Sequence, residues 1–435
     1  MLLDRPGISG FQTTVALLSA LVLFLDGFDT QAVNYAAPLI GQDLHLSRAL
    51  LGPVFSAGLA GLMVGYLALS PLADRVGYKR IVVASTAAFA LFTFATISAA
   101  SLMQLIALRF LTGIGLGAAI PAVVALVSEY SPRRLRASFV LAIYCGFSLG
   151  FVAAGFAAAQ LLGAYGWTSL FWIGAMLPLL LCPVLAAFLP ESLDHLVRIG
   201  APAVRIAAAL RRIDPALLAD GLVPHGQLAA PTRTGTVLDL LRGGRAVVTL
   251  LLWIVFAINL SAFYLLQSWL PTLLTGLHRP IDEVATATSL STVGGIAAAF
   301  VVGPAMDRLG ACRSLAVLYA AGAVGVALLG PALPAAMWEL SVASFFAGFC
   351  VSGGQKSAIA LATLFYPAAL RSAGLGWALG VGRAGGIAGP LIAGLLLGAG
   401  WTPTWLFHGV AVTLLAAALA TIAMYGRPGF EGVRL

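Results

Sequence analysis

The stretch Ser70-Pro71-Leu72-Ala73-Asp74-Arg75-Val76-Gly77 has a counterpart 233 positions later, Gly303-Pro304-Ala305-Met306-Asp307-Arg308-Leu309-Gly310. A second match has nearly the same offset, because Gly113, Pro132 and Arg136 correspond to Gly348, Pro367 and Arg371. Two motifs at one offset indicate that the chain consists of two structural copies. Transporters with repeats that move around a site at the membrane midplane have this organisation, whereas a channel or receptor predicts no such duplication.

The composition predicts a membrane protein. Of the 435 residues, 60% are apolar and 9% are charged, whereas an ordinary soluble domain has about a quarter charged residues. Apolar stretches long enough to cross a bilayer recur along the whole chain. We predict an all-α protein with twelve transmembrane helices, over residues 14–38, 49–71, 81–100, 103–128, 138–162, 167–189, 246–274, 284–305, 313–333, 338–364, 371–398 and 402–425.

The basic residues predict the orientation of these helices. With both termini in the cytoplasm, the cytoplasmic segments hold 19 of the 24 Lys and Arg residues, and the opposite loops hold only Arg48 and Arg279. The positive-inside rule therefore favours cytoplasmic termini. The same distribution explains the net charge of +8 without a nucleic-acid partner, which would need the arginines on one face. No cleavable signal peptide is recognised, because the polar start leads into a full-length span.

A polar segment divides the spans six and six. We predict an N-terminal six-helix bundle over 1–189, a cytoplasmic linker over 190–245 and a C-terminal six-helix bundle over 246–435. The linker is too short for a separate catalytic domain. The four cysteines lie mostly in apolar stretches and are interpreted as packing residues. The Ala, Gly and Arg excess points to a bacterial source, and thus to the inner membrane.

Five charged residues fall inside predicted spans, namely Asp26, Asp29, Arg109, Lys356 and Arg383. Each costs about 2.5 to 3.5 kcal/mol at the bilayer centre, so these residues must pair or face water. Three cations and two anions leave a net charge of +1, which one carboxylate substrate would neutralise. An organic anion with a proton is therefore a sensible cargo, and an organic cation is disfavoured.

Asp26 and Asp29 are three residues apart and project from adjoining positions of one helix face. Desolvation and a like charge both favour the protonated carboxyl, as a proton carrier near neutral pH requires. We predict that one or both carry the proton. The alternative is that one of them caps an unwound helix at Gly27, or pairs permanently with Arg109.

Several motifs resemble signatures of the major facilitator superfamily. These are the two Asp-Arg-x-Gly loops and Arg109-x-x-x-Gly113-x-Gly115-x-Gly117. Asp26-Gly27-Phe28-Asp29 and the segment Gly380 to Pro390 further resemble the aromatic acid:proton symporter family. The resemblance covers the whole chain and implies the twelve-helix fold of two pseudo-symmetric bundles. It also implies a role for Arg109 in proton movement, the alternative being a fixed structural cation.

Substrate binding is predicted mainly in the second half. Arg383 lies among glycines that clear space for a ligand or a helix neighbour, and its guanidinium can hold a carboxylate with two hydrogen bonds. Lys356, Gln355 and Ser352 form a polar cluster that departs from the family at Lys356, where a neutral residue is expected. Lys356 is predicted to contact the substrate; the alternative is a buried lysine that is neutralised or paired to an aspartate. Aromatic walls are expected from Tyr144 and Phe147, and from Tyr264 with Gln267, unless these residues only pack.

Ion networks at the cytoplasmic ends are expected to gate the transporter. A plain solvated loop is the alternative at these positions. The predicted members are Asp74, Arg75, Glu129, Arg136, Asp307 and Arg308.

These observations predict a symporter that imports an aromatic or related organic carboxylate with protons. Alternatives are a symporter of another organic acid or a sugar, and a proton antiporter that exports organic compounds. An enzyme is not expected, because no histidine lies in a span core and none has metal-site spacing. We expect no cofactor and no metal, the proton gradient being the driving force. A monomer in the lipid bilayer is the expected state, with the carboxylate and protons as its partners.

Overall fold

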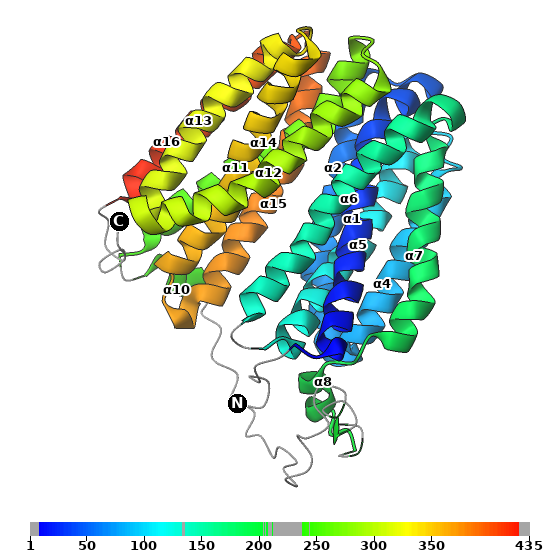
Figure 1. Cartoon of the computed structure of the whole chain (residues 1–435), viewed down its shortest axis with the longest axis vertical. Coiled ribbons are helices and arrows are strands. Elements are labelled where there is room, and N and C mark those ends of the chain that lie inside the picture. Colours follow the sequence, from blue (N-terminus) through cyan, green and yellow to red (C-terminus); the bar gives the residue numbers. More distant parts are fainter. Residues whose placement is uncertain are drawn as a thin grey trace. The chain divides into compact units, whose positions relative to one another are not determined.

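The computed structural model describes residues 8–132, 135–202, 204, 206, 207, 211, 237–242 and 244–425. Within these ranges the chain is almost entirely helical, and Figure 1 shows its long helices as rods. The helices are α1 (Gly10–Asp43), α2 (Arg48–Val64) with a π-helical turn (Gly65–Leu69), α3 (Ser70–Val76), α4 (Tyr78–Thr96), α5 (Leu102–Tyr130), α6 (Arg136–Tyr165), α7 (Thr168–Phe188), α8 (Leu193–Arg198), α10 (Val237–Leu241), α11 (Ala246–Gly276), α12 (Ile281–Leu309), α13 (Ala311–Ala332), α14 (Met337–Phe365), α15 (Ala368–Gly398) and α16 (Pro403–Met424).

The twelve predicted spans are confirmed as twelve long helices in the described part of the chain. Eleven of them are long and apolar enough to cross a membrane. The remaining one is α14, which has 29 residues. Ser352, Gln355 and Lys356 lie along it and lower its mean hydropathy. The helix with the weakest hydrophobic signal is thus one that was predicted to contact substrate.

The contacts group the described residues into two compact units. Unit 1 lies within Met1–Ala32, Ala57–Ala154 and Trp167–Gln227, and unit 2 within Val33–Ser56, Gly155–Gly166 and Leu228–Leu435. The C-terminal part of α1, the N-terminal part of α2 and the end of α6 therefore belong to unit 2. In the predicted topology these are their external ends. The division at a linker over 190–245 stays a prediction, since most of 203–236 lies outside the described residues.

The internal repeat is visible in the backbone. Gly77 has φ 111° and ψ 140°, and Gly310 has φ 92° and ψ 145°. Each glycine ends one helix and starts the next, in a conformation that side chains disfavour. His45 and His278 also lie 233 positions apart and share a positive φ, at 52° and 57°. The duplicated motif therefore encodes a duplicated turn.

Glycines in unit 1 let α5 approach its neighbours closely. A Cβ atom at Gly113 would overlap the carbonyl oxygen of Gly58 in α2, and one at Gly117 would overlap that of Leu62. Gly115 faces Phe89 of α4 in the same way. The Gly-x-Gly-x-Gly pattern therefore places α5 against α2 on one side and against α4 on the other.

Unit 2 contains a contact between small residues that we call the outer seam, formed by Ala49 and Gly52 of α2 with Gly394 and Gly398 of α15. A Cβ at Gly394 would lie 2.9 Å from the Ala49 carbonyl oxygen and 3.1 Å from the Gly52 Cα. One turn after Gly52 on α2, the Ser56 hydroxyl donates to the Ile387 carbonyl of α15 at 2.8 Å. The N-terminal part of α2, which the predicted topology places outside, therefore packs backbone to backbone against α15.

Gly113→Ala tests the glycine packing. The added methyl group must push α2 and α5 apart, so we expect the free energy of unfolding to fall by about 1 to 3 kcal/mol. Gly163→Ala in α6 is the matched control, because nothing lies within 4 Å of a Cβ there. Alanine should leave stability unchanged or raise it by up to about 1 kcal/mol at that position. Thermal unfolding in detergent measures both, and equal effects would contradict the packing argument.

Candidate functional site

The two aspartates of α1 are buried in unit 1, at 1% exposure for Asp26 and 3% for Asp29. The helix runs without a break through Gly27, so no helix end exists there for an aspartate to cap. Gly27 instead serves a helix contact, because a Cβ atom would overlap the carbonyl oxygen of Phe147 in α6. Close packing at Gly27 thus holds the segment that carries both carboxyl groups.

Asp29 forms a buried ion pair with Arg109 of α5. The Arg109 Nη1 atom lies 3.1 Å from the Asp29 Oδ2 atom, and both side chains are at most 4% exposed. The Thr93 hydroxyl of α4 donates to the Asp29 Oδ1 atom at 2.8 Å. Both carboxylate oxygens therefore accept a hydrogen bond from a neighbouring helix.

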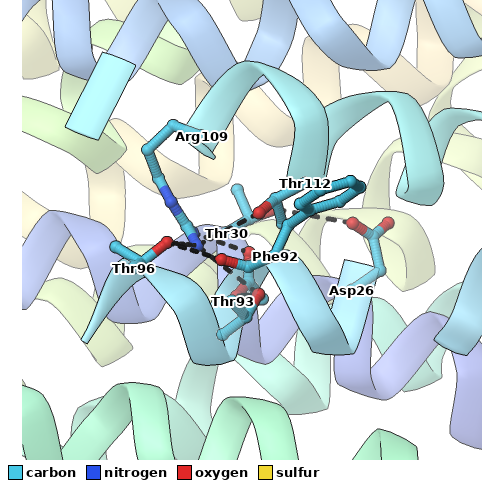
Figure 2. A network of polar contacts seen from close by, with 8 residues as sticks. Asp26, Thr30, Phe92, Thr93, Thr96, Arg109 and Thr112 are labelled. Carbon is cyan, nitrogen blue, oxygen red and sulfur yellow. Dashed lines mark hydrogen bonds and ion pairs between the residues drawn. The ribbon is translucent and has the colours of Figure 1, made fainter. Parts of the chain in front are cut away.

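Three threonines surround the other side of the Arg109 guanidinium. Its Nη2 atom donates to the hydroxyls of Thr96 at 3.0 Å, Thr112 at 3.3 Å and Thr93 at 3.4 Å. Figure 2 shows these hydroxyls converging on the end of the Arg109 side chain. The Phe171 ring of α7 has its centroid 5.0 Å from the guanidinium carbon, within the range of a cation–π contact. Four helices thus position one cation.

This arrangement links the proton on Asp29 to the position of Arg109. Burying a single ion costs several kcal/mol, which an ion pair with further hydrogen bonds offsets. If the Asp29 carboxylate takes a proton, the pair loses its attraction and the guanidinium, which cannot deprotonate, must find another anion or water. The charges of Asp29 and Arg109 are therefore interdependent.

Asp26 lies one turn before Asp29, at the edge of the network in Figure 2 and apart from Arg109. The Thr30 hydroxyl donates to the Asp26 Oδ1 atom at 3.5 Å. The two carboxyl groups therefore have different surroundings, Asp29 among donors from α4 and α5 and Asp26 beside a hydroxyl of its own helix.

The predicted aromatic residues of α6 differ in exposure. Phe147 is half-buried and packs on Phe151, with ring centroids 4.8 Å apart. Tyr144 is 43% exposed. Their predicted substrate contact stays a prediction.

In unit 2, Arg383 of α15 contacts Tyr264 of α11. The Arg383 Nη1 atom donates to the Tyr264 hydroxyl at 2.7 Å, and the guanidinium carbon lies 6.0 Å from the ring centroid. Gly386 leaves room for this ring, because a Cβ there would lie 2.8 Å from it. The glycines around Arg383 thus serve a helix neighbour, and they hold a half-buried guanidinium beside an aromatic face.

Gln267 lies one turn beyond Tyr264 on α11 and is 2% exposed. Its Nε2 atom donates to the Thr292 hydroxyl of α12 at 3.2 Å. Within the described residues its Oε1 atom accepts no hydrogen bond. The same holds for the Oδ1 atom of Asn259, whose amide donates to the Val351 carbonyl at 2.9 Å. Two buried acceptors on α11 are therefore open to a donor.

The predicted cluster on α14 lies against α12. Lys356 is exposed, and its ammonium donates to the Gly295 carbonyl at 2.8 Å. Ser352 is buried against Gly295 of α12, because a Cβ atom at Gly295 would lie 2.4 Å from the Ser352 Cβ atom. Gln355, which lies between Ser352 and Lys356 in the sequence, is half-buried. The hydrogen bond described for Lys356 is thus to a backbone carbonyl and not to an aspartate.

Half of the predicted gating residues, Asp74, Arg136 and Asp307, have side chains outside the described set. Arg75 and Arg308 are exposed and Glu129 is half-buried. The predicted ion networks therefore stay a prediction. A residue that was not predicted as a site does lie in this region, since the Glu191 carboxylate accepts from the backbone N–H groups of Lys79 at 3.1 Å and Ser192 at 3.0 Å. It binds the first turn of α4, where a negative charge is favourable.

Sequence reasoning also missed Thr93, Thr96, Thr112 and Asn259. A threonine in a transmembrane helix is common and carries no charge, so nothing distinguishes one that binds Arg109 from one that bonds its own helix. Asn259 could have been noticed as an amide in an apolar run. Its partner, a carbonyl of α14, could not.

The fold and the buried charges are those of a secondary transporter, and comparison with known families agrees. The model of the Major Facilitator Superfamily matches residues 19–280 and 252–433. The chain belongs to this superfamily and is a multi-pass membrane transporter, not an enzyme. Solved structures agree on the fold, for example the inward-open xylose transporter XylE from E. coli, with a TM-score of 0.71, 16% identity and 96% of each chain covered.

Characterised relatives identify the branch of the superfamily. The chain is 40% identical to the 4-hydroxybenzoate transporter PcaK of Pseudomonas aeruginosa, over 97% of this chain and 94% of the relative. It is 38% identical to the gallate transporter of Pseudomonas putida, over 97% and 93%. A 3-(3-hydroxy-phenyl)propionate transporter of Escherichia coli is 34% identical, over 94% and 93%. The chain is thus a member of the aromatic acid transporter family, and the resemblance seen in the motifs is confirmed.

The Asp29–Arg109 pair predicts unequal effects of its two neutral variants. Asp29→Asn leaves a buried cation that cannot lose its charge, and should cost about 3 to 5 kcal/mol of stability. Arg109→Gln leaves a carboxylate that can neutralise itself by taking a proton, so it should cost less. The double variant should recover part of the loss of Asp29→Asn.

Thermal unfolding in detergent tests this order. Thr112→Val is the control, because it removes one hydrogen bond to Arg109 and should cost only about 1 kcal/mol. Additive losses in the double variant would mean that the two side chains do not interact.

Proposed function

We propose that the protein imports an aromatic carboxylate together with protons, by alternating access and without a cofactor. The observation that carries the proton coupling is the Asp29–Arg109 ion pair, a titratable carboxyl group buried in a transmembrane helix and bound to a cation. The substrate class is supported by the relatives, since 4-hydroxybenzoate, gallate and 3-(3-hydroxyphenyl)propionate are aromatic carboxylates. The proton gradient supplies the energy.

In the proposed cycle, Asp26 or Asp29 takes a proton from outside. Arg383, with Lys356, binds the substrate carboxylate, and the Arg383–Tyr264 contact orients the guanidinium beside a ring that can stack on the substrate. Ser352, Gln355, Tyr144 and Phe147 complete the substrate contacts. The repeats then reorient, the cytoplasmic ion networks of the six gating residues break, and substrate and proton leave. Reversal of the empty carrier restores the Asp29–Arg109 pair.

We further propose a bacterial inner membrane as the location, with both termini in the cytoplasm, and a monomer as the working unit. The basic residues support this orientation, because they lie almost entirely in segments on one side. The ends of α1, α2 and α6 that carry few charges are placed outside by the same distribution of basic residues.

Proton movement tests the function directly. In proteoliposomes with an internal pH dye, addition of 4-hydroxybenzoate should acidify the lumen, while a sugar and a quaternary amine should have no effect. Asp29→Asn should abolish accumulation driven by a pH gradient but keep exchange of labelled for unlabelled substrate. Asp43→Asn, at the exposed end of the same helix, is the matched control and should behave as the unmodified protein.

The outcomes separate the alternatives. Acidification with the sugar alone would indicate a sugar symporter, and alkalinisation with the amine would indicate an exporting antiporter. Unchanged accumulation by Asp29→Asn would reject this residue as the proton carrier, and loss of accumulation by Asp26→Asn alone would assign the role to Asp26.

Substrate contacts can be separated by chemistry. Arg383→Ala should raise the KM of every aromatic carboxylate by about tenfold or more, a loss of roughly 1.4 kcal/mol for each decade. Gln267→Leu should weaken hydroxybenzoates, because the Oε1 atom of Gln267 is open to a hydroxyl donor, and leave benzoate unchanged. Competition assays with the two acids measure the ratio. Equal loss for benzoate and 4-hydroxybenzoate in Gln267→Leu would reject this hydroxyl contact.

A further inference from the structure

A cavity lined by both polar and apolar residues lies at the external end of unit 2, away from the charged residues inside the spans. Its volume is about 400 Å³, within the range of small-molecule sites, which starts near 300 Å³. Gln42, His45 and Arg48 line it from the turn between α1 and α2, and Thr272, Thr275 and Gly276 from the last turn of α11. Its lining therefore offers an arginine, an imidazole, an amide and two hydroxyls.

The two arginines on the external side have different surroundings. Arg279 is held by its neighbours, because it pairs with Glu283 at 2.9 Å and donates to the carbonyls of Leu333 and Ala335. Arg48 has no hydrogen bond or ion pair to any residue that the structure describes. Its guanidinium lies flat against Gly276, where a Cβ would be 2.7 Å from the Nη2 atom. Glycine at this position thus leaves room for the guanidinium in the cavity.

A purely structural role for Arg48 would be to cap the end of α11. The carbonyls there already accept hydrogen bonds from the following turn, since His278 donates to Thr275 at 2.9 Å and Arg279 donates to Leu274 at 3.2 Å. The end of the helix therefore does not require the arginine. Its five N–H donors in a planar fork therefore remain available to a ligand in this cavity, whose volume is large enough for an organic acid.

We propose that this cavity is an outer anion site, where Arg48 binds the carboxylate of an arriving substrate before the proposed substrate site at Arg383 opens to the outside. The proposal rests on the proposed function for the identity of the ligand, an aromatic carboxylate. Arginine holds a carboxylate with two parallel hydrogen bonds, and the Gln42 amide can donate to its oxygens. The Thr272 and Thr275 hydroxyls donate to the carbonyls of Ser268 and Pro271 and can accept from a ring hydroxyl. The apolar carbons of Pro38 and Leu51 in the lining suit an aromatic ring.

The position of the cavity gives it a role in transport. Arg48 is followed directly by Ala49, which with Gly52 forms the outer seam against Gly394 and Gly398. The seam must separate for a substrate to pass between α2 and α15. A carboxylate held at Arg48 therefore waits beside the contact that opens, and its local concentration there is raised while the seam is closed.

Transport measured from the two sides tests the proposal. Arg48→Gln should raise the KM for uptake in right-side-out vesicles about fivefold, the factor for an exposed ion pair of about 1 kcal/mol, and leave the KM for efflux in inside-out vesicles unchanged. Arg48→Lys should restore part of the uptake affinity. Arg279→Gln also removes one positive charge from the external side. If it raises the KM for uptake equally, the effect comes from the general electrostatic field of the protein, and a local site at Arg48 is rejected. An equal rise in both KM values for Arg48→Gln would also reject it.

A labelling experiment tests binding without transport. Thr275→Cys in a Cys145→Ser background places a thiol in the cavity and removes the one exposed cysteine among the four. A membrane-impermeant anionic thiosulfonate should label it faster than a cationic one, and benzoate should protect it. Arg48→Gln should remove both the preference and the protection. If labelling shows neither, or does not occur, the site does not exist. If labelling behaves as expected while benzoate moves no protons into proteoliposomes, the outer site stands and the proposed function fails.

Discussion

Membrane insertion imposes one constraint on this protein above all others, which is that the charge of Asp29 and the charge of Arg109 must be buried together. A charge alone in a transmembrane helix is costly, and threonines from α4 and α5 bind the pair, one donating to the Asp29 carboxylate and three accepting from the Arg109 Nη2 atom. Glycines hold the helices that carry these groups close to their neighbours, since Gly27 packs α1 against α6 and Gly115 packs α5 against α4. The ion pair, at 3.1 Å, therefore lies in a closely packed part of unit 1.

The two membrane-embedded cations of unit 2 fit the proposed anionic substrate. Unit 2 contributes Arg383 and Lys356, whose described partners are a tyrosine hydroxyl and a backbone carbonyl. Under the proposed function, a proton acceptor in unit 1 and anion receptors in unit 2 would give the two cargoes separate binding chemistry.

The sequence alone predicted the twelve helices, because apolar runs of 20 or more residues and the positions of the arginines are strong signals. It also identified the charged residues, since a charge in a membrane span is rare. It did not predict how these charges are satisfied. The contacts Arg109–Thr96 and Lys356–Gly295 depend on the rotation of each helix and on which polar group faces the neighbour, and hydropathy does not encode either. Gly27 illustrates the difference, because an unwound helix there was one of the alternatives left open by the sequence, whereas the structure shows an unbroken α1 that approaches α6.

The outer seam between Ala49, Gly52, Gly394 and Gly398 contains no ionisable group and no interlocking side chains. Its strength comes from dispersion between backbones in contact, with one hydrogen bond from Ser56 nearby. Such a contact has a shallow, short-ranged energy well, and neither salt nor pH alters it directly. If the seam opens in the proposed cycle, its rate of opening should therefore respond to the lateral pressure and thickness of the surrounding lipid, and bilayer composition would control turnover independently of the proton gradient.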